Sequence, residues 1–158
     1  MAIQGKRVAD SAAEMLQVVL PNDTNPLGNA LGGTVMHWID LVAAIAAYRH
    51  SRRPVVTVSM DRLDFREPIR LGYIVSLKAR LYYVGRTSME VGVDVFAEDP
   101  RTGKQRQTSS ALVTYVALND SGQPAPVPPL ILTTDDERAQ FEAARQRRQK
   151  RGLSAASP

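Results

Sequence analysis

Hydrophobic and polar residues alternate along several stretches in the middle of the chain, which is the pattern of strands with one buried face. The alternation is strict in Gly72–Tyr83 and Thr87–Phe96, and it changes phase within Pro54–Phe65, near Asp61, where a bulge or bend is expected. Thr108–Leu118 is apolar on both faces, which favours the interior of a sheet. Because short turns join these stretches, the pattern predicts an antiparallel sheet.

The segment Gly32–Arg49 has a different pattern, which predicts a helix. It is too long for a strand, contains no Pro, and is rich in Ala. Between Val35 and Tyr48 only His37 and Asp40 are polar, and with Thr34 they recur at every third position, on an arc of about 120°. A helix that is apolar nearly all round is a buried helix.

The order of these elements predicts one α+β domain in which an antiparallel sheet wraps around a single long buried helix. Glu14–Leu20 adds a short first strand, so this domain spans residues 14–119. Residues 1–13 are expected to be flexible. Residues 120–158 are expected to form a Pro-rich crossing and then a polar, basic helix and tail, opened by a capping box at Thr134–Glu137. One copy alone would leave sheet edges and a flank of the buried helix exposed, which predicts at least a dimer.

The composition excludes several classes of protein. With 158 residues, 44% hydrophobic and 23% charged, the chain fits one globular domain rather than a disordered or fibrous protein. It has no Cys and only two His, so the sequence predicts no disulfide, no thiol nucleophile and no metal site. No apolar run approaches the ~20 residues needed to span a bilayer, and no secretory signal is visible, so a cytoplasmic location is expected.

The net charge of +4 is concentrated near the C-terminus. Five basic residues lie between Arg145 and Arg151, and they exceed the net charge of the whole chain, so the remainder is close to neutral. A solvated basic tail is the favoured interpretation. Contact with a phosphorylated small molecule comes second, and nucleic acid has the least weight.

Asp40 is the most informative single residue, because an unpaired carboxylate on an apolar helix costs several kcal/mol. One interpretation is a structural Asp that bonds to a neighbouring strand or lies at an interface. The favoured interpretation is a general base or nucleophile, since a partly desolvated carboxylate suits that chemistry.

The start of the same helix is a second candidate. Gly32-Gly33-Thr34 places free N–H groups at its positive pole, which suits an anion or oxyanion, although a tight packing turn remains an alternative. Asn29 lies just upstream and is more often a turn residue. Gly33 and Asp40 are seven residues apart, about 10 Å along the helix. If both act on one carbonyl, Asp40 must come from a second, antiparallel copy.

The blocks PNDTNPLGNALGGTVMHWID, VVTVSMDRLDFREPIRLGYIV and VGRTSMEV, in this order, resemble the hotdog-fold acyl-CoA thioesterases, specifically the cytosolic acyl-CoA hydrolase branch. The resemblance covers about Leu16 to Leu118. It implies the hotdog fold, hydrolysis of acyl-CoA to free CoA and a carboxylic acid, and assembly of dimers into hexamers. Coenzyme A would then be part of the substrate, with no separate cofactor.

The resemblance also assigns roles to individual residues. Asp40 matches the helix carboxylate that activates water or attacks the thioester, Asn29 matches a loop residue that positions water or the carbonyl, and Gly33 falls at the oxyanion-hole amide. The turn Val84, Gly85, Arg86, Thr87 and Ser88 matches a segment that contacts CoA in relatives.

Two competing functions are considered. A hydratase of the same fold would use a catalytic His near the helix start, but no His precedes Met36. A non-catalytic acyl-CoA sensor or regulatory hotdog protein is the alternative function, and the retained Asn29, Gly33 and Asp40 argue against it. Acyl-chain length is not encoded in any feature of the sequence.

Overall fold

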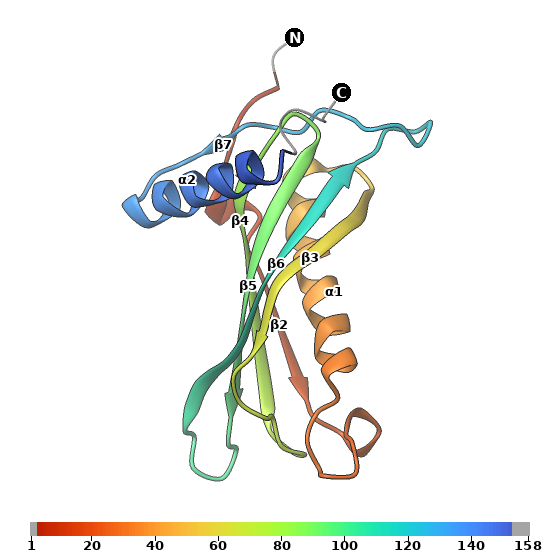
Figure 1. Ribbon diagram of the computed structural model, residues 1–158, viewed down its shortest axis with the longest axis vertical. Coiled ribbons are helices and arrows are strands. Elements are labelled where there is room, and N and C mark those ends of the chain that lie inside the picture. The colour runs from red at the N-terminus through yellow and green to blue at the C-terminus, as the bar shows by residue number, and fades with distance from the viewer. Residues whose placement is uncertain (1–2, 153–158) are drawn as a thin grey trace.

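A five-stranded antiparallel sheet forms the centre of the fold (Figure 1). The computed structural model describes residues 3–152. The sheet strands are Ala13–Val18 (β2), Val55–Phe65 (β3), Ile74–Val84 (β4), Ser88–Glu98 (β5) and Gln105–Ala117 (β6). Their order across the sheet is β2-β4-β5-β6-β3, so β6 lies in the interior, as its two apolar faces predict.

The irregularity predicted in the strand after the helix is present in β3. Its pairing with β6 slips between Asp61 and Asp64, and Arg62 within this slip has a positive φ of 50°. A second slip, between Thr57 and Ser59, was not apparent from the alternation. These bulges bend β3 at the edge of the sheet.

Helix α1, Gly32–Ser51, packs along one face of the sheet (Figure 1). Its inner side enters the core beside alternate residues of the strands, such as Leu77, Leu81 and Val91. The prediction of a buried helix is right for this side only. Four large apolar residues, which we call the α1 flank, are 41–51% exposed: Met36, Leu41, Ile45 and Tyr48. An exposed flank of this kind is what the dimer prediction requires.

Helix α2, Asp135–Lys150, packs against the opposite face of the sheet. Alternation along β4 directs Leu81 into the core and Arg80 to this other face, where Arg80 forms an ion pair of 2.6 Å with Asp136 of α2. The ring centroids of Tyr83 and Phe141 are 4.8 Å apart. As predicted, Thr134 is the N-cap of this helix, and its Oγ1 accepts a hydrogen bond of 3.1 Å from the N–H of Glu137.

The N-terminal segment is not the flexible region expected from the sequence. Lys6–Arg7 (β1) pairs in parallel with Leu130–Ile131 (β7), and Lys6 Nζ donates to the carbonyl oxygens of Arg49 and His50, over 3.1 and 2.8 Å, at the end of α1. A cation suits the negative end of a helix. Residues 1–2, and residues 153–158 of the expected tail, lie outside the described residues. Within residues 3–152, no helix is both long and apolar enough to cross a membrane.

Candidate functional site

Asp40 lies half-buried on α1, where hydroxyl groups from two strands reach its carboxylate. Thr57 Oγ1 of β3 donates a hydrogen bond of 2.9 Å to Asp40 Oδ1, and Tyr115 Oη of β6 donates one of 2.7 Å to the same oxygen. Tyr115 is only 1% exposed. Both hydroxyls converge on Oδ1, so Oδ2 receives no hydrogen bond from the described residues. The carboxylate is thus held in place with one oxygen left for proton transfer or attack.

The Tyr115 hydroxyl is a permanent donor at neutral pH. Burial, together with the hydrogen bond to Asp40, raises the pKa of Tyr115 above its usual range. The structural interpretation of Asp40 is therefore correct about its bonds to neighbouring strands, and those bonds are compatible with catalysis. Thr57 and Tyr115 are not predictable as site residues from the sequence, because Thr and Tyr are ordinary strand residues and nothing local marks them as partners of a helix.

The loop before α1 is ordered by its own Asp and Asn side chains. Asn25 Oδ1 accepts hydrogen bonds from the N–H groups of Leu27 and Asn29, over 3.0 and 3.2 Å. The Ala30 N–H donates over 2.7 Å to the carbonyl of Ile69, which ties the loop to the segment before β4. Short polar side chains that bond to the nearby backbone explain why this stretch is a loop.

A cleft of about 340 Å³ lies beside the start of α1 and is lined in part by Asn29, Gly32 and Phe65. Asn29 Oδ1 is buried there without a hydrogen-bond partner among the described residues. The N-cap residue Leu31 supplies no side-chain acceptor, so within residues 3–152 no N-cap side chain accepts from the first N–H groups of α1. At Gly33, apart from its chain neighbours and the backbone of α1 itself, no atom of the described residues lies within 4 Å of where a Cβ would stand. The cleft offers donors and a positive helix pole to a carbonyl oxygen or an anion.

Within one protomer, Asn29 lies beside the start of α1, and both Asn29 and the helix start are distant from Asp40. Asp40 does not line the cleft, and it lies seven residues beyond Gly33 on the same helix, about 10 Å along the axis. The separation inferred from the sequence is therefore present. No three His, Cys, Asp or Glu residues in residues 3–152 are grouped so as to hold a metal ion.

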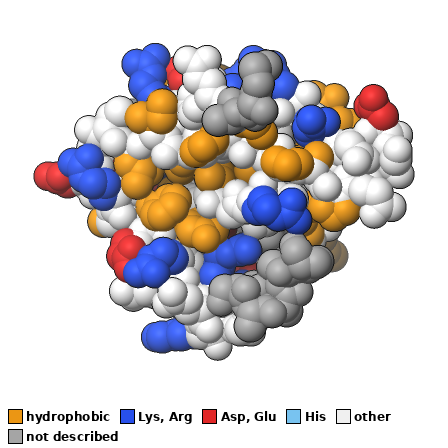
Figure 2. All heavy atoms as spheres, turned by 90° about the horizontal axis from the view of Figure 1, so that it is seen from above, with side chains coloured by type: hydrophobic (Ala, Val, Ile, Leu, Met, Phe, Trp, Pro, Cys, Tyr) orange, Lys and Arg blue, Asp and Glu red, His pale blue; other side chains and the backbone are white. Residues whose placement is uncertain are grey.

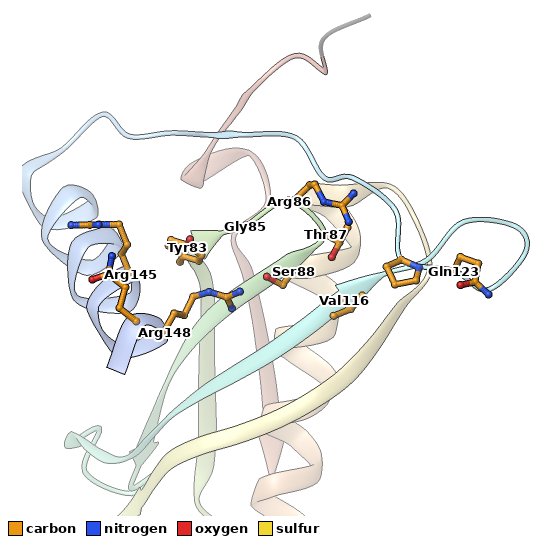
Figure 3. Close-up of a pocket in the computed structure, with 11 residues that line it drawn as sticks. Tyr83, Gly85, Arg86, Thr87, Ser88, Val116, Gln123, Arg145 and Arg148 are labelled. Atoms are coloured by element: carbon orange, nitrogen blue, oxygen red, sulfur yellow. The ribbon is translucent and has the colours of Figure 1, made fainter. Parts of the chain in front are cut away.

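A larger cavity, of about 710 Å³, lies at the opposite end of the molecule, at the turn between β4 and β5 (Figures 1 and 3). Four of the five predicted CoA-contacting residues line it: Gly85, Arg86, Thr87 and Ser88. Val84 does not, and lines a neighbouring cleft of about 370 Å³ instead. Arg145 and Arg148 of α2 form the facing wall of the larger cavity. The turn and two arginines of the basic cluster, which lie far apart in the sequence, therefore line one cavity.

The basic cluster is not simply solvated. Arg147 forms a buried ion pair with Glu90 of β5, and Arg151 forms a partly exposed ion pair of 2.7 Å with Asp61 of β3. Arg148 stacks on Tyr83, with its guanidinium carbon 5.1 Å from the ring centroid. Seen from the end that carries the β4–β5 turn, Lys and Arg side chains are more prominent than Asp and Glu side chains (Figure 2). The cluster thus docks α2 on the sheet and contributes positive charge at this end of the molecule.

Comparisons with known proteins agree with this architecture. Residues 27–104 match the thioesterase superfamily. The chain is 41% identical over 133 residues to an uncharacterized acyl-CoA thioester hydrolase, YkhA, of Bacillus subtilis, covering 84% of this chain and 77% of that protein. It is also 37% identical over 143 residues to the cytosolic acyl coenzyme A thioester hydrolase of Rattus norvegicus, but it spans only 37% of that longer protein.

Solved structures give the same result. An apo-hexameric acyl-CoA thioesterase superposes with a TM-score of 0.91 at 38% identity, over 99% of this chain and 100% of that one. The acyl-CoA hydrolase of Staphylococcus aureus superposes with a TM-score of 0.87 at 36% identity, over 96% of this chain and 92% of that one. The hotdog fold predicted from the resemblance is confirmed, and the chain belongs to the thioesterase superfamily, among the acyl-CoA thioester hydrolases.

Proposed function

We propose that this protein hydrolyses acyl-CoA thioesters to free CoA and a carboxylic acid. The main support is the Asp40 carboxylate: Thr57 and Tyr115 donate hydrogen bonds to its Oδ1, while Oδ2 accepts none from the described residues. Relatives that are named acyl-CoA thioester hydrolases support this function. So does the Staphylococcus aureus hydrolase, whose structure was solved in complex with butyryl coenzyme A and coenzyme A.

In the proposed reaction Asp40 takes one of two roles. As a general base, it removes a proton from water while the water oxygen attacks the thioester carbon, and the CoA thiolate leaves and takes up a proton. As a nucleophile, it attacks the thioester carbon and the C–S bond breaks, so that the CoA thiolate leaves, takes up a proton and leaves a mixed anhydride that water then hydrolyses. In both routes the carbonyl oxygen gains negative charge. The backbone amide of Gly33, at the uncapped start of α1, is the proposed donor to that oxygen, and one good donor contributes about 3–4 kcal/mol.

The spacing of three substituted residues in a solved relative supports Asp40 and Thr57 as site residues and indicates Asn25 as a third. Structures of the Staphylococcus aureus hydrolase include alanine variants of an aspartate, of an asparagine fifteen residues before it, and of a threonine seventeen residues after it. In this chain Asn25 and Thr57 stand at the same two spacings from Asp40. Since Asn25 Oδ1 accepts a hydrogen bond from the N–H of Asn29, we assign Asn25 to the site together with Asn29, the residue that the family resemblance indicates.

The proposed active site is shared between two copies of the chain. The start of α1 lies at one end of the protomer and the Gly85–Ser88 turn at the other, so an antiparallel second copy would bring its helix start toward this copy's turn (Figure 1). The exposed α1 flank provides an apolar surface for that contact. The apo-hexameric relative supports a homo-oligomer, and within it we propose a trimer of dimers. A cytoplasmic location stays a prediction.

The function is tested by incubating the purified protein with acyl-CoA esters of increasing chain length and following free thiol with a chromogenic reagent. The proposal expects thiol release above the spontaneous rate for at least one ester. It also expects an equimolar amount of the carboxylic acid. Saturable binding of acyl-CoA with no thiol release across the series would instead identify the non-catalytic sensor.

A further inference from the structure

We propose that Arg148 of α2 completes a subsite with the Gly85–Ser88 turn, and that this subsite binds the nucleotide phosphates of coenzyme A. The inference rests on the proposed function and assigns a role to the C-terminal helix, which lies outside the sequence blocks that carry the family resemblance.

The lining of the 710 Å³ cavity suits a polyanion. It contains three arginines, Arg86, Arg145 and Arg148, and no Asp or Glu. Thr87 and Ser88 add hydroxyl donors at the turn. A guanidinium presents its N–H groups in a fork that matches two phosphate oxygens, so this set of donors is typical of phosphate recognition.

Among the α2 arginines, Arg148 is the one left for a ligand. Arg145 is held by Glu142 through two hydrogen bonds of 2.9 and 2.5 Å, and Arg147 is held by Glu90. Arg138, at the other end of the helix, pairs with Asp135. Arg148 has no carboxylate partner among the described residues, and it extends from α2 toward Ser88, on the far side of the cavity (Figure 3).

The surrounding residues hold this guanidinium in place. Tyr83 contacts Arg148 on one turn of α2 and Phe141 two turns earlier, and the neighbouring Arg147–Glu90 ion pair fixes the same part of the helix on the sheet. A Cβ at Gly85 would stand 2.9 Å from Ser88 Oγ and 3.6 Å from an Arg148 guanidinium nitrogen. Glycine at this position therefore keeps open the space between the turn and the arginine.

The subsite is separate from the reacting carboxylate. On β6, Val116 lines the cavity, whereas its neighbour Tyr115 holds Asp40 on the opposite face of the sheet. Arg148 should accordingly affect binding of the nucleotide end and leave the chemical step unchanged. Its loss should raise KM far more than it lowers kcat.

The direct test measures binding of adenosine 3′,5′-bisphosphate to the full-length protein by calorimetry, without any turnover. Arg148→Gln should weaken binding about tenfold, as expected for one charge-assisted contact, and Arg148→Lys should recover part of it. Arg138→Gln is the matched control: it removes the same charge from the same helix and should leave binding unchanged. The difference should shrink at high salt. Equal affinity of wild type and Arg148→Gln at low salt would overturn the proposal.

A second experiment excludes a merely structural role for Arg148. KM is compared for an acyl-CoA and for the same acyl group on pantetheine, which lacks the nucleotide. Arg148→Gln should raise KM for the first substrate only, whereas a displaced α2 or misfolding would impair both. If Arg148→Gln does not fold, Ser88→Ala takes its place, because it leaves the α2 contacts intact. Bisphosphate binding that depends on Arg148 without thioester hydrolysis would refute the proposed function alone.

Discussion

Replacing Tyr115 by Phe tests whether the buried hydroxyl holds the Asp40 carboxylate. The substitution removes the donor of the 2.7 Å hydrogen bond to Asp40 Oδ1 and keeps the ring in the core. Hydrogen bonds to charged groups contribute about 1.5–3 kcal/mol. Because Asp40 is half-buried and Thr57 still donates to the same oxygen, we expect the lower end, about 1.5 kcal/mol of unfolding free energy at pH 7.

The pH dependence of this loss provides a second, independent check. Burial in the folded state and the hydrogen bond to Asp40 raise the pKa of Tyr115 above its usual value of 10.0, so the folded state binds the phenol proton more tightly than the unfolded chain. The resulting stabilisation is complete below pH 10 and declines as pH rises further, by up to about 1.4 kcal/mol per pH unit. Tyr115→Phe lacks this group, so the stability gap between wild type and variant should close near pH 11.

The assay is urea unfolding of both proteins at one protein concentration, from pH 7 to pH 11. Tyr73→Phe is the control, because the Tyr73 hydroxyl also donates to a carboxylate, that of Asp99, but over 3.3 Å near the surface. We expect that control to cost less than about 0.5 kcal/mol. The reasoning is refuted if Tyr115→Phe costs no more than Tyr73→Phe at pH 7, or if its gap to wild type stays constant up to pH 11.

Three further predictions concern the assembly and the docking of α2. Mixing inactive Asn29→Ala and Asp40→Ala proteins under subunit exchange should restore part of the thioesterase activity, and no recovery despite proven exchange would favour a site within one chain. Leu41→Glu, which places a charge on the α1 flank, should shift the protein toward monomer in light scattering and reduce activity in parallel; an unchanged mass would remove this flank from the interface. Glu90→Gln leaves Arg147 buried without its charge partner and should cost about 3 kcal/mol of stability and speed amide exchange in α2. As a control, Asp136→Asn removes the exposed Arg80–Asp136 ion pair and should cost under about 1 kcal/mol of stability. Equal losses of stability in Glu90→Gln and Asp136→Asn would contradict the special role of the buried pair.

The sheet and the buried helix were predictable because both are encoded in local periodicity. Period-two alternation placed β4 and β5, and the phase change near Asp61 located a bulge that appears at Arg62. The apolar helix with Asp40 on one side was equally visible. The α1 flank, by contrast, shows that an apolar helix can be buried by the sheet on one side and stay exposed on the other, where we propose that a second copy binds.

The contacts that complete the candidate sites were not predictable, since they join residues distant in the sequence. Tyr115 reaches Asp40 across 75 positions, and Arg147 reaches Glu90 across 57. No spacing rule links a helix carboxylate to a particular strand hydroxyl, and no pattern in the Pro-rich crossing indicates where α2 will dock. For the same reason the pairing of Lys6–Arg7 with β7 appeared from the sequence as a flexible terminus.

The central claim is that Asp40 drives thioester hydrolysis, and thiol release by wild type and Asp40→Asn tests it most directly. The two proteins are compared on the best acyl-CoA substrate at saturating concentration, after circular dichroism shows both to be folded. Asn has the shape of Asp but cannot act as the base or the attacking carboxylate. We predict that kcat falls about 10²-fold or more, in the range of lost acid–base catalysis. A folded Asp40→Asn protein that releases thiol at the wild-type rate would contradict the account.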